Sequence, residues 1–73
     1  MRVELGVLVR RINRKLRRDD QMLKKARSER ARLDLGDFYI LNFNRNIVVA
    51  RHVDPVGLAR ELGVLDADEV VSE

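Results

Sequence analysis

A chain of 73 residues is short enough for one small domain, and 15 Lys and Arg against 12 Asp and Glu give it a net charge of +3. The absence of cysteine excludes a disulfide framework and a thiolate metal site. No apolar run approaches the ~20 residues that a membrane-spanning helix needs. We therefore expect a single domain over residues 1–73, located in the cytoplasm and without a membrane partner.

The positive charge is concentrated in the first half of the chain. Residues 1–32 carry 12 cationic and 4 acidic side chains, a net charge of +8, whereas residues 33–73 carry 3 and 8, a net charge of −5. This asymmetry suggests a polyanionic partner for the first half, or electrostatic pairing between the halves within one molecule or across a dimer.

Residues 1–35 are predicted to form a basic helical segment. Apolar residues recur at helical spacing and form one stripe, and most of the cations lie on the opposite side. We favour one helix over residues 4–32; the alternative is a break near "RRDD", with Asp20 capping a second helix. A single helix of this length would span roughly 43 Å. Part of it would then project from the domain or be covered by another subunit.

Residues 37–53 are predicted to form a β-hairpin. "FYILNF" and "NIVVARHV" are rich in β-branched and aromatic residues, and "NRN" between them supplies turn formers, including asparagines that tolerate positive φ. Both faces of the hairpin are apolar. Because a two-stranded ribbon is at best marginally stable alone, we expect helices on one face and a helix or a second subunit on the other. Phe38, Tyr39 and Phe43 are assigned to the core.

Residues 54–73 are predicted to form a C-terminal helix and tail. Asp54 suits the N-cap, Pro55 the first helical position and Gly63 a left-handed residue after the helix, while Asp66 is placed to cap a last turn. "GLARELGV" resembles the first helix and turn of a helix-turn-helix, but phosphate would repel the acidic segment that follows. We therefore interpret it as a capped amphipathic helix.

The predicted fold class is α+β, with a long basic N-terminal helix, a two-stranded antiparallel hairpin and a short C-terminal helix in the order α-β-β-α. Catalysis is not expected. The chain has one histidine, His52, two serines and neither threonine nor cysteine, so no nucleophile has an evident base. The four glycines are scattered and form no phosphate-binding loop. We expect no cofactor and no metal.

The cationic side of the first helix is the remaining candidate for function. Three interpretations compete: a solvated surface, a surface that binds nucleic-acid phosphates, and a surface that docks on an acidic protein. We expect a small regulatory binding protein that contacts nucleic acid first, with an acidic surface of a larger enzyme or complex as the alternative target, and a homodimer. The residues predicted to make these contacts are Arg10, Asn13, Arg14, Arg17, Arg18, Lys24 and Lys25.

Overall fold

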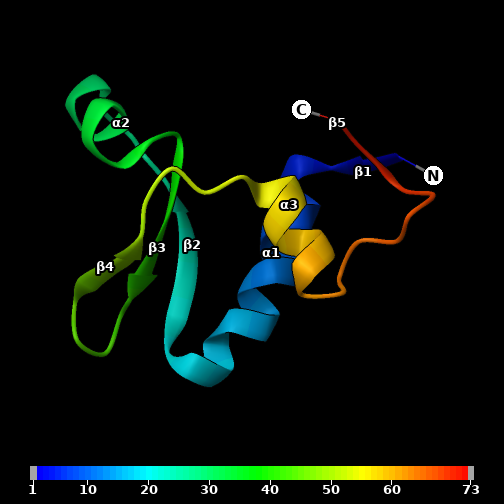
Figure 1. Ribbon diagram of the computed structural model, residues 1–73, viewed down its shortest axis with the longest axis horizontal. Coiled ribbons are helices and arrows are strands. Elements are labelled where there is room, and N and C mark those ends of the chain that lie inside the picture. The colour runs from blue at the N-terminus through cyan, green and yellow to red at the C-terminus, as the bar shows by residue number, and fades with distance from the viewer. Residues whose placement is uncertain (1, 73) are drawn as a thin grey trace.

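The computed structural model describes residues 2–72, which form an α+β fold of three α-helices and two small sheets (Figure 1). The helical elements are α1 (Leu5–Leu16), η1, a single 3₁₀ turn (Arg17–Asp19), α2 (Glu29–Leu35) and α3 (Pro55–Glu61). The antiparallel sheet has the order β2 (Gln21–Lys25), β3 (Phe38–Asn42), β4 (Ile47–Ala50). The parallel pair is β1 (Arg2–Glu4) with β5 (Val70–Ser72). None of the helices within residues 2–72 is long and apolar enough to cross a bilayer.

The α+β class, an N-terminal helix and the short C-terminal helix are confirmed, but the two-stranded hairpin is wrong because β3 and β4 belong to a three-stranded sheet, and the order α-β-β-α is wrong as well. The first helix ends at Leu16, and residues 21–25 form a third strand beside the hairpin. Asp20 does not cap a second helix, because its backbone is left-handed, with a φ of 58°. A left-handed residue interrupts a right-handed helix, so the chain reverses direction at this point.

Strand β2 is fixed by the sheet on one side and by α1 on the other. Leu23 pairs with Ile40 of β3 and is 2% exposed. Its backbone N–H donates a hydrogen bond to Oδ1 of Asn13 in α1, with a donor–acceptor distance of 2.6 Å. Leu23 therefore reaches the core as the helical stripe predicted, but from a strand. Since side chains alternate across a strand, Met22 and Lys24 lie on the other face of the sheet.

The hydrophobic core lies where α1 meets β2 and α3 (Figure 1). Leu8 and Ile12, one helical turn apart in α1, are completely buried. The other buried apolar members of this cluster are Val3, Leu16, Leu23, Ile40, Ala59 and Leu65. Because α1 turns this stripe inward, its cations are left on the outer side of the molecule.

Helix α3 has the predicted boundaries. The Asp54 carboxylate accepts hydrogen bonds from the backbone N–H groups of the first turn, Pro55 is the first helical residue, and Gly63 follows the helix with a φ of 73°. No second helix follows among residues 62–72, since the chain makes a turn and then pairs with β1 as β5. The prediction that Asp66 caps a last helical turn is therefore wrong, and the helix-turn-helix resemblance ends at the turn.

The β3–β4 turn places Phe43 against the end of η1. The backbone N–H of Phe43 donates to the carbonyl oxygen of Asp20 at 2.9 Å. Within the turn, Oδ1 of Asn42 accepts hydrogen bonds from two successive backbone N–H groups, and Asn46 has the positive φ expected of an asparagine here. Phe38 packs against the core, but Phe43 is 48% exposed. The assignment of Phe43 to the core is therefore wrong.

Candidate nucleic-acid interface

Helix α1 and turn η1 present five exposed cations on the outer side of the molecule. Along the chain they follow one another at spacings of four, one, two and one residues, so on successive turns they occupy roughly half of the circumference of the helix. From the first to the fourth of them the helix rises by about 10 Å. These five residues, which we call the basic face, are Arg10, Arg14, Lys15, Arg17 and Arg18.

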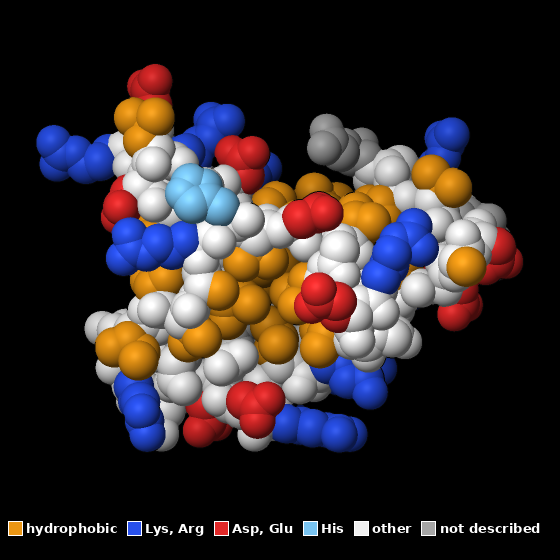
Figure 2. All heavy atoms as spheres, in the orientation of Figure 1, with side chains coloured by type: hydrophobic (Ala, Val, Ile, Leu, Met, Phe, Trp, Pro, Cys, Tyr) orange, Lys and Arg blue, Asp and Glu red, His pale blue; other side chains and the backbone are white. Residues whose placement is uncertain are grey.

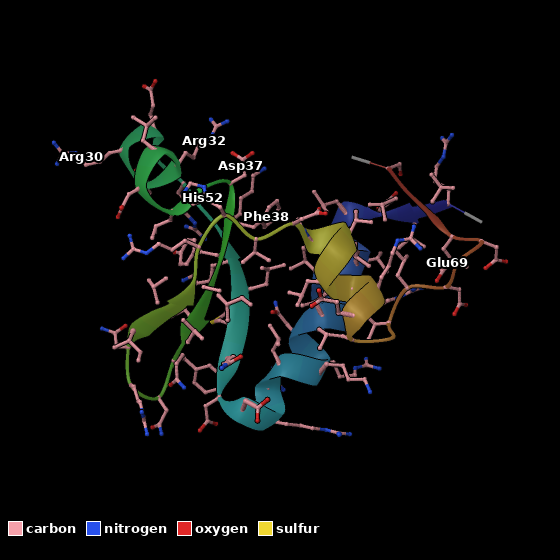
Figure 3. All side chains as sticks on the ribbon, in the orientation of Figure 1. Arg30, Arg32, Asp37, Phe38, His52 and Glu69 are labelled. Carbon is pink, nitrogen blue, oxygen red and sulfur yellow. The ribbon has the colours of Figure 1, made fainter. Side chains whose placement is uncertain are left out.

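The basic face has no ion-pair partner among the carboxylates of residues 2–72, whereas three other arginines do. These three pairs are Arg11–Glu69, Arg32–Asp37, seen at the junction of α2 and β3 in Figure 3, and Arg51–Asp34, with N–O distances of 2.9–3.1 Å. The chain's own carboxylates thus neutralise cations elsewhere. An external anion would therefore not have to displace an internal ion-pair partner from the basic face.

Two neighbouring hollows border the basic face on the side of β2. The first, which we call the arginine hollow, has a volume of about 370 Å³ and is lined by Arg10, Asn13, Arg14 and Arg17. The second, which we call the aromatic hollow, has a volume of about 560 Å³ and is lined by Asn13, Arg17, Gln21, Met22 and Phe43. Because both hollows include Asn13 and Arg17, they adjoin each other, and we call the two together the depression.

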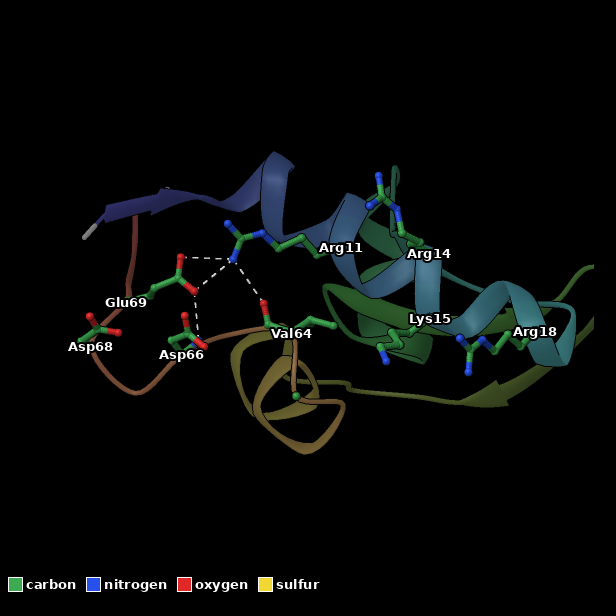
Figure 4. Close-up of a pocket in the computed structure, with 9 residues that line it drawn as sticks. Arg11, Arg14, Lys15, Arg18, Val64, Asp66, Asp68 and Glu69 are labelled. Carbon is green, nitrogen blue, oxygen red and sulfur yellow. Dashed lines mark hydrogen bonds and ion pairs between the residues drawn. The ribbon is translucent and has the colours of Figure 1, made fainter.

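A third hollow, of about 650 Å³, lies on the adjacent flank of α1 and shares Arg14 with the arginine hollow. Figure 4 shows Arg14, Lys15 and Arg18 projecting from α1 and η1, while Asp66, Asp68 and Glu69 come from the C-terminal segment. These carboxylates would repel a phosphate group in this hollow. An anion bound to Arg14 is therefore favoured in the arginine hollow, whose lining contains no carboxylate.

Arg11 is excluded from the basic face because it holds the C-terminal segment onto α1. Its Nη1 donates to both carboxylate oxygens of Glu69, at 3.1 and 3.2 Å, and to the carbonyl oxygen of Val64 at 3.2 Å. The hydrogen bond from the backbone N–H of Asp66, together with the one from Arg11, lowers the pKa of Glu69. Glu69 therefore stays charged at neutral pH and neutralises Arg11.

The seven predicted contact residues do not form one ridge. Four of them, Arg10, Asn13, Arg14 and Arg17, line the arginine hollow, and Arg18 lies on the next turn. Lys24 and Lys25 lie on β2 instead of on the helix, where they line a separate hollow with Arg27 and Arg32. The prediction that they share the helix face is wrong, because the helix ends before them.

Three residues that line the depression, Gln21, Met22 and Phe43, were not among the predicted contacts. Lys15 was not among them either; it belongs to the basic face but lines the third hollow, and it could have been included by taking a wider face of the helix. Gln21 and Phe43 reach the depression only because the chain turns at Asp20. For Phe43 the available signal was its place at the end of a predicted strand, next to the turn.

Comparison of the chain with protein-family models, with curated proteins and with solved structures finds no match. Within residues 2–72 no group of three His, Asp or Glu side chains is arranged to hold a metal ion. The chemistry of the depression is therefore that of its own side chains: three guanidinium groups, two amides, a thioether and an aromatic ring.

Proposed function

We propose that the protein is a small, non-catalytic regulatory binding protein whose basic face contacts nucleic-acid phosphates. The observation that best supports this proposal is that five neighbouring exposed cations have no ion-pair partner within residues 2–72. Guanidinium groups form strong charge-assisted hydrogen bonds with phosphate oxygens. Since one strand of a duplex has a phosphate about every 3.4 Å along its axis, the ~10 Å between Arg10 and Arg17 spans about three phosphates.

The contacts of the basic face are expected to position a nucleic acid without reading its sequence. Arginine and lysine side chains that meet phosphate oxygens supply affinity that is independent of the bases. Asn13 is the one amide on α1, and its Oδ1 already accepts the hydrogen bond from Leu23. We therefore expect similar affinities for unrelated sequences.

The test is equilibrium binding of random-sequence DNA and RNA at low salt. In the test variant Arg14, Arg17 and Arg18 are each replaced by Gln. The matched control replaces the exposed and equally unpaired Arg2, Arg45 and Arg60 by Gln, which removes the same charge from β1, the hairpin turn and α3. The test variant should lose most of the binding and the control should keep it. Equal losses in the two variants, or no binding by the natural protein, would contradict the proposal.

An acidic surface of a larger enzyme or complex is the second candidate target. Figure 2 shows apolar side chains gathered at the centre of one face, between the β3–β4 hairpin and α3, with charged side chains around them. An apolar centre with a polar rim is typical of surfaces that bind proteins. This candidate predicts a stoichiometric complex that is recovered after nuclease treatment, whereas a nucleic-acid complex would be lost.

A homodimer is a further part of the proposal. Strand β4 is an edge of the antiparallel sheet, and its residues Ile47 and Val49 are 50% and 49% exposed. On the sheet face that points away from Leu23, Met22, Leu41 and Val48 are partly exposed. A second copy would remove this apolar surface from water. Sedimentation at micromolar concentration should give the dimer mass; the monomer mass alone would contradict this part.

A further inference from the structure

The aromatic ring of the depression is held in a defined place. Phe43 is 48% exposed, yet its backbone is tied to Asp20 by a hydrogen bond of 2.9 Å, and the turn that follows it is closed by Asn42. A single exposed apolar side chain needs no special explanation. Leu33 on α2, at 80%, is such a case, because it lines none of the hollows described above. Phe43 differs from Leu33 because it lines the aromatic hollow together with Asn13, Arg17 and Gln21.

Two amide side chains in the aromatic hollow have unused hydrogen-bonding groups. The hydrogen bond from Leu23 occupies Oδ1 of Asn13 and leaves its Nδ2 as a donor. The side chain of Gln21 makes no hydrogen bond to another residue within the described part of the chain. Because no buried side-chain polar atom of residues 2–72 lacks a partner, these groups are open to solvent. Amides of this kind match the donor and acceptor edges of nucleobases.

The cations and the ring are arranged in sequence along the depression. Arg17 belongs to both hollows, so a strand whose phosphates contact Arg10 and Arg14 can place its next base beside Phe43. A cationic groove that follows the backbone, combined with an aromatic ring for stacking, is the usual arrangement in proteins that bind single-stranded nucleic acid. In a duplex each base is stacked between its neighbours and paired, so its flat face is not accessible to such a ring.

We infer that the aromatic hollow receives an unpaired nucleobase stacked on Phe43, so that the ligand of the basic face is single-stranded nucleic acid. The amides of Asn13 and Gln21 contact the edge of this base, and Arg17 contacts its phosphate. This inference rests on the proposed function, and it adds the strandedness of the ligand and the residue that selects it. DNA and RNA share the chemistry involved, and the experiment below distinguishes them.

The direct readout is fluorescence, because the chain has no tryptophan. In the variant Phe43→Trp the indole replaces the ring at the hollow, and in the matched control Leu33→Trp an indole is placed on the exposed side of α2. The probes are oligonucleotides of deoxyuridine and of uridine, which carry the same base and differ only in the sugar, and a mixed-sequence duplex of the same length. Both single strands should quench Phe43→Trp but not Leu33→Trp, and the duplex should quench neither. The tighter binder of the two single strands identifies the preferred sugar.

The affinity readout uses Phe43→Ala, with Phe43→Tyr as the variant that keeps the ring. Removal of one stacked base contact should weaken single-strand binding by about 5- to 150-fold and leave duplex binding unchanged. Phe43→Tyr keeps the ring for stacking and should keep the affinity of the natural protein for the single strand. Circular dichroism of Phe43→Ala should match that of the natural protein, since Phe43 lies outside the core.

Unchanged single-strand binding by Phe43→Ala, together with a loss of binding when Arg14, Arg17 and Arg18 are replaced, would overturn the stacked base and leave the proposed function standing. Equal weakening of single-strand and duplex binding by Phe43→Ala would also overturn it, because stacking would not act on a paired base. Failure of the natural protein to bind any of the probes would overturn the proposed function and the inference together.

Discussion

Under the proposed function, the number of unpaired cations on the basic face sets the salt dependence of nucleic-acid binding. Each phosphate neutralised by a cation releases counterions, so log K falls with log salt concentration by about 0.7 per contact for a single strand and about 0.9 for B-DNA. Five cations lie on the basic face, and Arg11 is not counted because it is paired with Glu69. The slope should therefore not exceed about −3.5 for a single strand.

Replacement of Arg14, Arg17 and Arg18 by Gln leaves Arg10 and Lys15, and should reduce the slope to about −1.4. The control in which Arg2, Arg45 and Arg60 are replaced loses the same charge but should keep a slope near −3.5. The difference arises because counterion release depends on the phosphates actually contacted rather than on the net charge of the protein.

The slope can be measured by fluorescence anisotropy of a labelled single-stranded oligonucleotide between about 50 and 200 mM salt, the range over which such contacts change affinity strongly. Equal slopes for the natural protein and the test variant would refute the assignment of phosphate contacts to the basic face. A slope of the natural protein well beyond −3.5 would refute the count, since it would require contacts from other cations such as Lys24 and Lys25.

Three further predictions concern the turn, the backbone and the C-terminal segment. Asp20→Asn removes a negative charge beside the basic face, and asparagine tolerates the φ of 58° at this position. Single-strand binding by this variant should therefore tighten by about two-fold. Weaker binding would contradict the placement of the ligand at the basic face. Gly36 and Gly63 both have positive φ, which costs a residue with a side chain about 1–2 kcal/mol. The two positions differ in the space around them: a Cβ at Gly36 would lie 2.8 Å from Cα of His52, whereas a Cβ at Gly63 has no neighbour within 4 Å. Urea denaturation should therefore show a larger loss of unfolding free energy for Gly36→Ala than for Gly63→Ala, and equal losses would refute the close approach. Because the pKa of Glu69 is lowered in the folded protein, its charge stabilises the fold above the ordinary glutamate pKa of about 4.3, and this stability is lost as the pH falls through the lowered pKa. Glu69→Gln should thus lower Tm at pH 7 and make Tm less dependent on pH below 5. Parallel curves of Tm against pH for the natural protein and the variant would contradict the assignment.

The hairpin and α3 could be predicted because their signals are local. A turn of asparagine and arginine lies between two β-rich runs, and Asp54, Pro55 and Gly63 each act within a few residues of their own position. The carboxylate of Asp54, for example, caps N–H groups two and three residues later. Such chemistry does not depend on the rest of the fold, so it can be recognised in a single sequence.

The end of the first helix could not be predicted from hydrophobic spacing. In residues 21–25 only Leu23 is buried, and one buried residue in five fits a helix as well as a strand. The deciding events are the left-handed backbone of Asp20 and the hydrogen bond between Leu23 and Asn13, which join residues that a straight helix would keep apart. The alternative break near "RRDD" was at the right place, but the element after it is a strand.

Strands β1 and β5 could not be predicted, since they are short and come from opposite ends of the chain. Arg2 pairs with Val70, and each strand has three residues, too few for an alternating pattern to be recognised. Their position depends on tertiary contacts: Val3 is 5% exposed in the core, and Glu69, just before β5, binds Arg11. The acidic residues of the second half could be recognised in the sequence, but the arginine with which each of them forms an ion pair could not be predicted.

Under the proposed function, the turn at Asp20 also bears on the kind of nucleic acid that the basic face would bind. A continuous helix would have placed Lys24 and Lys25 in line with Arg17 and offered only phosphate contacts, which suit a duplex and a single strand alike. In the structure those lysines leave with β2, and the hydrogen bond from Phe43 to Asp20 brings an aromatic ring to the end of the cationic row instead. The loss of two cations weakens the general attraction to phosphate, while the gain of a ring adds a contact that only an unpaired base can make. The same reversal of the chain that shortens the helix therefore supports our inference that the ligand is a single strand rather than a duplex.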